Sequence, residues 1–236
     1  MKQQTVSPAA PSAETARLLA CGVVAGPLFL AVLMIQAFTR EGFDLSRHPL
    51  SLLSLGDLGW IQIANFVATG ALFVACAMGM RRALGLGRSG TWAPRLVGAF
   101  GVGLIVAGVF TTDAGAGFPP GAPAGAPEQI SWHGILHEVG SGLAFIGMIV
   151  GCLVFARRFA ALKRRGWAGA CVATAAAALA LASWPDTDGV SARLVIASAI
   201  LFAFVAAMAA RLMRGLPVAP ETSAEAGSAD ALRSAA

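Results

Sequence analysis

The chain has 236 residues, of which 57% are hydrophobic and 12% are charged. Soluble domains carry about 25% charged residues, so this composition excludes an ordinary water-soluble fold. The hydrophobic share also excludes a disordered chain, and four cysteines in so long a chain exclude a disulfide scaffold. The composition therefore indicates an integral membrane protein.

Six stretches without Asp, Glu, Lys or Arg are long enough to cross a membrane. A hydrocarbon layer roughly 30 Å thick requires about 20 apolar residues of helix, and these stretches hold 17 to 23 residues each. They do not alternate apolar and polar residues as the strands of a membrane barrel do. We predict an all-α, polytopic membrane protein, a six-helix transmembrane bundle with spans at about 18–38, 59–80, 96–112, 134–156, 167–185 and 192–213.

The membrane domain is expected to occupy residues 17–214. The segments on either side of it are rich in Ala, Ser, Pro and Glu and lack apolar periodicity. Such segments bury too little apolar surface to fold. We therefore predict disordered tails at residues 1–16 and 215–236.

The basic residues predict which way the chain is oriented. Of the 17 Lys and Arg residues, 14 lie in the two tails and in the second and fourth loops. Short loops rich in Lys and Arg stay in the cytoplasm. We expect both termini in the cytoplasm of a multi-pass protein of the cell membrane. Because this topology accounts for the net charge of +5, no nucleic-acid partner is expected.

The two long outer loops differ in character. After His48 and Pro49, five leucines alternate with serines and glycine, a pattern typical of a short interfacial helix entered at a proline. We expect this helix to lie on the outer membrane surface. Residues 114–127 consist of Gly, Pro, Ala and one Phe, which predicts an irregular flap.

The histidines and several of the carboxylate side chains, which can bind metals or transfer protons, lie on the predicted outer side. His133 and His137 are four apart, so on a helix they share one face, and Glu138 follows directly. Asp113 closes the third span at the same depth, and His48 enters from the first outer loop. Three imidazoles and a carboxylate form a ligand set that suits zinc with one position left for water.

Other interpretations of the same residues stay open. The histidines can brace the flap by hydrogen bonds to loop carbonyls and to Asp113, or they can bind a proton or a ligand. A haem is disfavoured because two of the three histidines share a helix. No charged residue lies near the middle of a span, which disfavours an ion-coupled transporter.

The chain resembles the bacterial six-helix membrane family called domain of unknown function 998. The resemblance covers nearly the whole chain between residues 17 and 214 and implies a membrane protein without an assigned activity. It is carried by the run Arg47-His48-Pro49-Leu50-Ser51-Leu52-Leu53-Ser54-Leu55-Gly56, by Gly59-Trp60, Asn65-Phe66 and Gly70, by residues 110–113, and by His133-Gly134-Ile135-Leu136-His137.

A more distant similarity is to the superfamily that includes alkaline ceramidases and adiponectin receptors. Its members place a Ser, an Asp and three His around zinc, although they have seven helices and carry their histidine pair on the last. The similarity implies that the zinc ligands are among His48, Asp113, His133 and His137. It implies catalytic candidates among Ser51, Ser54, Asp113 and Glu138.

Two functions follow as hypotheses. The first is a membrane protein without enzymatic activity, which binds a ligand or partner, or senses a signal, through a polar His- and Asp-bearing site at its outer face. Besides the lipid bilayer itself, its partner would be a lipid or a small hydrophobic ligand. The alternative is a zinc-dependent membrane hydrolase acting on lipid-like substrates.

Overall fold

The protein is described by a computed structural model covering residues 11–85, 87–127, 129–184 and 189–215. The prediction of an all-α bundle is confirmed, because the described residues form six helices long and apolar enough to cross a membrane and no strand. These helices are α1 (Ala13–Thr39), α2 (Gly59–Leu84), α3 (Arg88–Val109), α4 (Trp132–Ala161), α5 (Arg165–Ala182) and α6 (Val190–Met213), with the 3₁₀ helix η1 (Leu50–Ser54) between α1 and α2.

Several helices extend beyond the predicted spans at the ends that carry charges. α2 continues past Arg81 to Leu84, and α3 begins at Arg88, eight residues before the predicted start at 96. Arginine side chains can keep an apolar stem along the helix and place the guanidinium in the polar layer. A charge therefore marks the edge of the hydrocarbon layer and not the end of the helix.

The start of α1 also differs from the prediction. Ser12 caps the helix, since its Oγ accepts a hydrogen bond from the Thr15 backbone N–H at 3.3 Å. Residues 13–16 are consequently helical, although we predicted them as part of a disordered tail. Residues 1–10 and 216–236 of the predicted tails lie outside the described residues.

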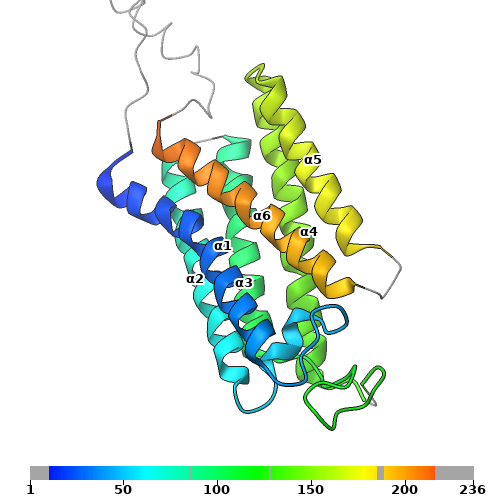
Figure 1. The fold of residues 1–236 in the computed structure, drawn as a ribbon. Coiled ribbons are helices and arrows are strands. Elements are labelled where there is room, and N and C mark those ends of the chain that lie inside the picture. The colour runs from blue at the N-terminus through cyan, green and yellow to red at the C-terminus, as the bar shows by residue number, and fades with distance from the viewer. Residues whose placement is uncertain (1–10, 86, 128, 185–188, 216–236) are drawn as a thin grey trace, which may run out of the picture.

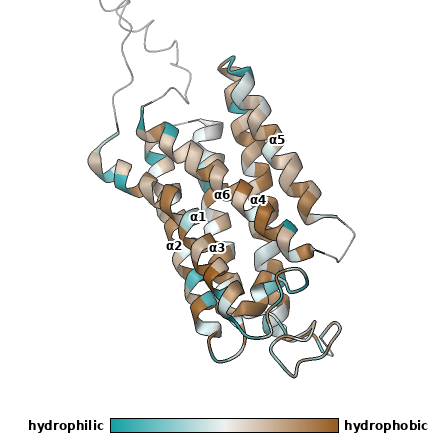
Figure 2. Cartoon of the chain, in the orientation of Figure 1, coloured by the Kyte–Doolittle hydropathy of each residue, from teal (hydrophilic) through white to brown (hydrophobic). Residues whose placement is uncertain are grey.

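The six helices form a closed ring in which each packs against its neighbours in sequence and α6 returns to α1 (Figure 1). The start of α1 and the end of α6 lie at one end of the bundle, called here the termini end. The loop residues 40–58, 110–127 and 129–131 lie at the opposite end, called the long-loop end. Apolar residues cover most of the length of the helices, with polar residues concentrated toward both ends (Figure 2).

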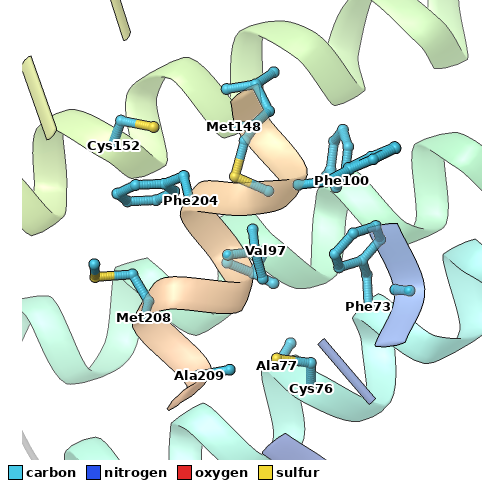
Figure 3. Packing of buried hydrophobic residues seen from close by; sticks show 14 of the residues in the cluster. Phe73, Cys76, Ala77, Val97, Phe100, Met148, Cys152, Phe204, Met208 and Ala209 are labelled. Carbon is cyan, nitrogen blue, oxygen red and sulfur yellow. The ribbon is translucent and has the colours of Figure 1, made fainter. Parts of the chain in front are cut away.

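The core of the bundle is a cluster of aromatic and sulfur-containing side chains (Figure 3). Phe73 of α2 has its ring centroid 5.1 Å from that of Phe100 of α3 and 5.3 Å from that of Phe202 of α6. Phe29 of α1 adds an edge-on contact with Phe202 at 5.4 Å. Since lipid tails are as apolar as these side chains, the helices associate through such close packing and not through the hydrophobic effect.

Glycines bring α2 and α3 into backbone contact. A Cβ atom at Gly70 would lie 2.5 Å from the Gly101 carbonyl oxygen, and a Cβ atom at Gly101 would lie 2.6 Å from the Gly70 carbonyl oxygen. Neither position therefore has room for a side chain. The two glycines set the distance between α2 and α3, as small residues do in membrane helix pairs.

Two substitutions on α3 test this contact. Gly101→Ala should lower the free energy of unfolding by about 1–3 kcal/mol, and with it the unfolding midpoint, because the new methyl group overlaps the backbone of α2. Gly98→Ala should leave the midpoint unchanged or raise it, because its Cβ would lie 3.5 Å from the Ala77 Cβ and alanine favours helix by about 1 kcal/mol over glycine. Thermal unfolding of the purified variants in detergent measures both. Equal midpoints would contradict the close approach of α2 and α3.

Candidate functional site

The loop between α1 and α2 folds into the bundle. It contains η1, whose side chains Leu50, Leu52 and Leu53 are all buried. The prediction of a short helix after Pro49 is confirmed, but its expected place on the membrane surface is wrong. The leucines do not face the lipid on one side of a surface helix, because η1 packs against α1, α2 and α6 and its leucines fill the space between them.

Arg40 holds this loop in place. Its guanidinium donates hydrogen bonds to the carbonyl oxygens of Leu53, at 3.2 Å, and of Leu55, at 2.6 Å. It also lies 5.5 Å from the ring centroid of Phe118, which is buried in the second long loop. Partial burial lowers the pKa of the Arg40 guanidinium, and the nearby Asp57 opposes this. The two long loops are thereby joined through one cation.

His48 is a structural link between the same two loops. Its Nδ1 accepts a hydrogen bond from the Asp44 backbone N–H at 2.9 Å. Its Nε2 lies 2.9 Å from the Ala116 carbonyl oxygen and must therefore donate. The ring is also packed against Phe43 and Phe118, with centroid separations of 5.4 Å and 5.6 Å. Both nitrogens are occupied, so His48 has no lone pair left for a metal.

His133 and His137 lie on the first two turns of α4 and face the end of α3. The Nδ1 of His133 donates to the Thr111 carbonyl oxygen at 2.8 Å. The Nδ1 of His137 donates to the carbonyl oxygens of Ala107, at 2.8 Å, and Phe110, at 3.0 Å. These carbonyls belong to the C-terminal end of α3, where backbone acceptors lack helical partners. Both histidines thus brace the junction between α3 and α4.

Asp113 supports the N-terminus of α4. Its Oδ2 accepts a hydrogen bond from the Ser131 backbone N–H at 3.0 Å, while the Ser131 hydroxyl caps the helix by accepting from Gly134 N–H at 3.0 Å. A hydrogen bond from the Ser131 side chain is the main reason that the pKa of Asp113 lies below its usual value, and the bond from the Ser131 backbone N–H lowers this pKa further. Desolvation of the carboxylate opposes both effects. The nearby His133 adds to this lowering.

The predicted metal ligands are not gathered around one point. Among the residues that the structure describes, no three His, Cys, Asp or Glu side chains lie close enough together to hold a metal ion. The histidines are engaged with carbonyl groups instead. The zinc role predicted for His48, Asp113, His133 and His137 therefore stays a prediction that this geometry does not support.

Two cavities lie beside these residues. The first, called the bundle cavity, has a volume of about 420 Å³ and lies inside the helix ring. Aromatic and aliphatic side chains from α1, α2, α3, α4 and α6 form most of its wall, and Ala182 at the end of α5 completes it. Its polar groups are those of Ser51, His137, Glu138, Ser141 and Ser198.

The second, called the loop cavity, has a volume of about 520 Å³ and lies between the two long loops. Its charged groups are Arg47, Asp113 and Glu138. Pro49, Ser51 and Glu138 line both cavities, so the two cavities adjoin at these residues. The wall of the bundle cavity is mostly apolar, whereas the wall of the loop cavity includes three charged side chains.

Comparison with known proteins places the chain in a family. The family model described as protein of unknown function (DUF998) matches residues 23–211. The chain belongs to the DUF998 family. The resemblance noted from the sequence is thus confirmed for this family. Nothing among curated proteins or solved structures matches the chain, and the similarity to ceramidases and adiponectin receptors stays a prediction.

In this DUF998 protein, the structure brings together part of the predicted site. Ser51, Asp113 and Glu138 line the loop cavity, and His137 lines the adjoining bundle cavity. Ser54 does not take part, because it is buried and its hydroxyl donates to the Ser51 carbonyl oxygen at 2.6 Å. His48 and His133 line neither cavity.

Sequence reasoning missed two serines of this DUF998 protein that line the bundle cavity. Ser141 lies four residues after His137 and three after Glu138, so helical spacing alone would have placed it on their face. Ser198 comes from the middle of α6 and carries no comparable signal, because its place depends on how α6 packs across the ring.

Acid titration tests the role of Asp113 in this DUF998 protein. An unfolded Asp titrates near about 3.9, and the folded pKa is lower, so the stability from Asp113 is present above that value and lost as pH falls through the folded pKa. Asp113→Asn should lower stability at neutral pH by less than about 1 kcal/mol, since the side chain is partly exposed. Between about pH 5 and 3, the unfolding midpoint of Asp113→Asn should fall less than that of the unsubstituted protein. Parallel curves for the two proteins would contradict this assignment.

Proposed function

We propose that this protein binds an amphipathic molecule taken from the membrane, with its hydrocarbon part in the bundle cavity and its polar part in the loop cavity. The observation that carries the proposal is that the two cavities adjoin, sharing Pro49, Ser51 and Glu138 in their walls. An apolar cavity beside one with charged side chains matches a molecule with the same two parts.

The size of the bundle cavity supports this. Ligand sites commonly have volumes of about 300–1,000 Å³, and the bundle cavity has about 420 Å³. It extends along α4 from His137 to Phe145, which at 1.5 Å per residue is about 12 Å. This depth is most of one leaflet of a bilayer whose hydrocarbon layer is roughly 30 Å thick.

Access to the cavities is supported by the exposure of Glu138. This side chain is exposed and lines both cavities, so their junction can be reached from outside the protein. α5 contributes to the bundle cavity only through its last residue, Ala182, and its span is the least buried of the six. A molecule in the bilayer can therefore approach the bundle cavity beside the C-terminal end of α5.

The orientation belongs to the same proposal. The termini end carries most of the Lys and Arg residues, and the loops 40–58 and 110–131 carry only two. By the positive-inside rule, the long-loop end then faces the outside of the cell membrane, and the ligand comes from the outer leaflet. Residues 17–214 would form the binding unit. We do not extend the proposal to zinc-dependent hydrolysis, because the described residues gather no metal ligand set.

Two glycines of α4 provide a matched test. Gly142 lines the bundle cavity, whereas Gly147 does not, and a Cβ at either position meets nothing within 4 Å. Gly142→Leu should fill the cavity and remove amphiphiles that copurify with the protein, while Gly147→Leu should keep them. Native mass spectrometry and lipid analysis of the purified proteins measure the occupancy.

The outcomes separate clearly. Loss of bound amphiphile in Gly142→Leu alone supports the proposal, and both variants should fold because each replaces a helical glycine with a better helix former. Equal occupancy in the two variants overturns it. Absence of any bound amphiphile in the unsubstituted protein, with none taken up from added lipid, overturns it as well.

A further inference from the structure

The hydrocarbon part of a membrane ligand gives the protein little means of selection. Lipid tails already lie in an apolar surrounding, so moving a chain from the bilayer into the bundle cavity gains no hydrophobic free energy. Preference for one ligand must come from the polar groups at the cavity wall. The hydrogen-bonding state of those groups therefore indicates which polar group is recognised.

His137 offers an acceptor. Its Nδ1 carries the proton, because it donates to the carbonyl oxygens of Ala107 and Phe110. The neutral ring then presents Nε2, on its opposite side, as a lone pair. The side chain is only 3% exposed and lines the bundle cavity, and none of the described residues donates a hydrogen bond to Nε2. Nε2 is not among the fully buried side-chain atoms that lack a partner, so it keeps accessible surface to which a donor on a ligand can bond.

Glu138 adds a second acceptor beside the first. It lines the junction of the two cavities and forms no ion pair within the described part of the chain. Ser141 lies on the same face of α4, three residues after Glu138 and four after His137. Its hydroxyl can accept as well as donate. The side of the cavity formed by α4 is therefore rich in acceptors.

The charges at the junction disfavour an anion. The loop cavity contains two carboxylates, Asp113 and Glu138, against one guanidinium, Arg47. Arg47 also interacts electrostatically with Asp44, whose carboxylate lies in the same loop. A ligand carboxylate or phosphate would meet more negative than positive charge here, and like charges repel across short distances.

We infer that the recognised ligand carries a hydrogen-bond donor, a hydroxyl or a protonated amine, at the head of its hydrocarbon chain, and that His137 Nε2 and the Glu138 carboxylate accept from it. This inference rests on the proposed function, because it assigns the polar end of the amphiphile for which the two cavities are suited. His137 has two roles in it: Nδ1 braces α3 and Nε2 recognises the ligand.

Four probes with the same alkyl chain test the inference. Dodecanol and dodecylamine carry donors, dodecyl methyl ether carries none, and dodecanoate is an anion. The full chain is placed in phosphatidylcholine nanodiscs, since this lipid headgroup has no hydrogen-bond donor, and binding is titrated by native mass spectrometry. The two donor probes should bind about five- to tenfold more tightly than the ether, the factor expected for one net hydrogen bond.

His137→Phe and His133→Phe form the matched pair of variants. Both replace an imidazole that donates to a carbonyl at the end of α3, but only His137 lines a cavity. His137→Phe should bind the alcohol and the ether equally, and His133→Phe should keep the preference. If His137→Phe does not fold, Glu138→Gln, at an exposed position, should weaken binding of the amine relative to that of the alcohol, because it removes the negative charge that attracts the ammonium group.

Each outcome decides between the two proposals. Equal binding of all four probes, or tightest binding of dodecanoate, overturns the donor inference while leaving amphiphile binding in place. A preference that survives in His137→Phe also overturns it. Failure of every probe to bind the unsubstituted protein overturns the proposed function itself.

Discussion

The carbonyl groups at the ends of the helices are the constraint on which the long-loop end depends. A helix leaves its last carbonyl oxygens without partners, and close to lipid there is little water to satisfy them. The chain supplies donors from side chains: Arg40 to η1, His137 and His133 to the end of α3, and His48 to the second loop. These bonds hold η1 and both long loops against the bundle, and the cavities form between the parts so held.

The same hydrogen bonds determine which side-chain atoms remain available to bind a ligand. A histidine that donates from one nitrogen and accepts at the other, as His48 does, has nothing to offer a metal or a substrate. His137 differs because its backbone partners occupy only Nδ1, and its side chain lines the bundle cavity. Of the residues that looked alike in the sequence, only those with an unused polar atom beside a cavity remain candidates for binding.

The number and course of the helices could be predicted from the sequence because charged residues are absent from each span. Helix ends could not, since Arg81 and Arg88 continue the helices into the polar layer. The gathering of His133, His137 and Asp113 near one junction followed from helical spacing, but the partners of each nitrogen depend on where the end of α3 lies. The burial of η1 was also beyond the sequence, because alternating leucines suit a membrane surface as well as a core.

The position of the bundle cavity follows from unequal spacing around the ring. α2, α3 and α4 approach one another through glycines, where Gly70 meets Gly101 and a Cβ on Gly103 would overlap the Gly140 carbonyl. Between α4 and α6 no glycine makes such an approach, and the two helices touch through the rings of Phe155 and Phe204, whose centroids lie 5.6 Å apart. The cavity therefore lies on the α6 side of α4, where Gly142 leaves room. Because a Cβ at Gly142 would meet nothing within 4 Å, a larger side chain there extends into the cavity and away from the glycine contacts that hold α2, α3 and α4 together.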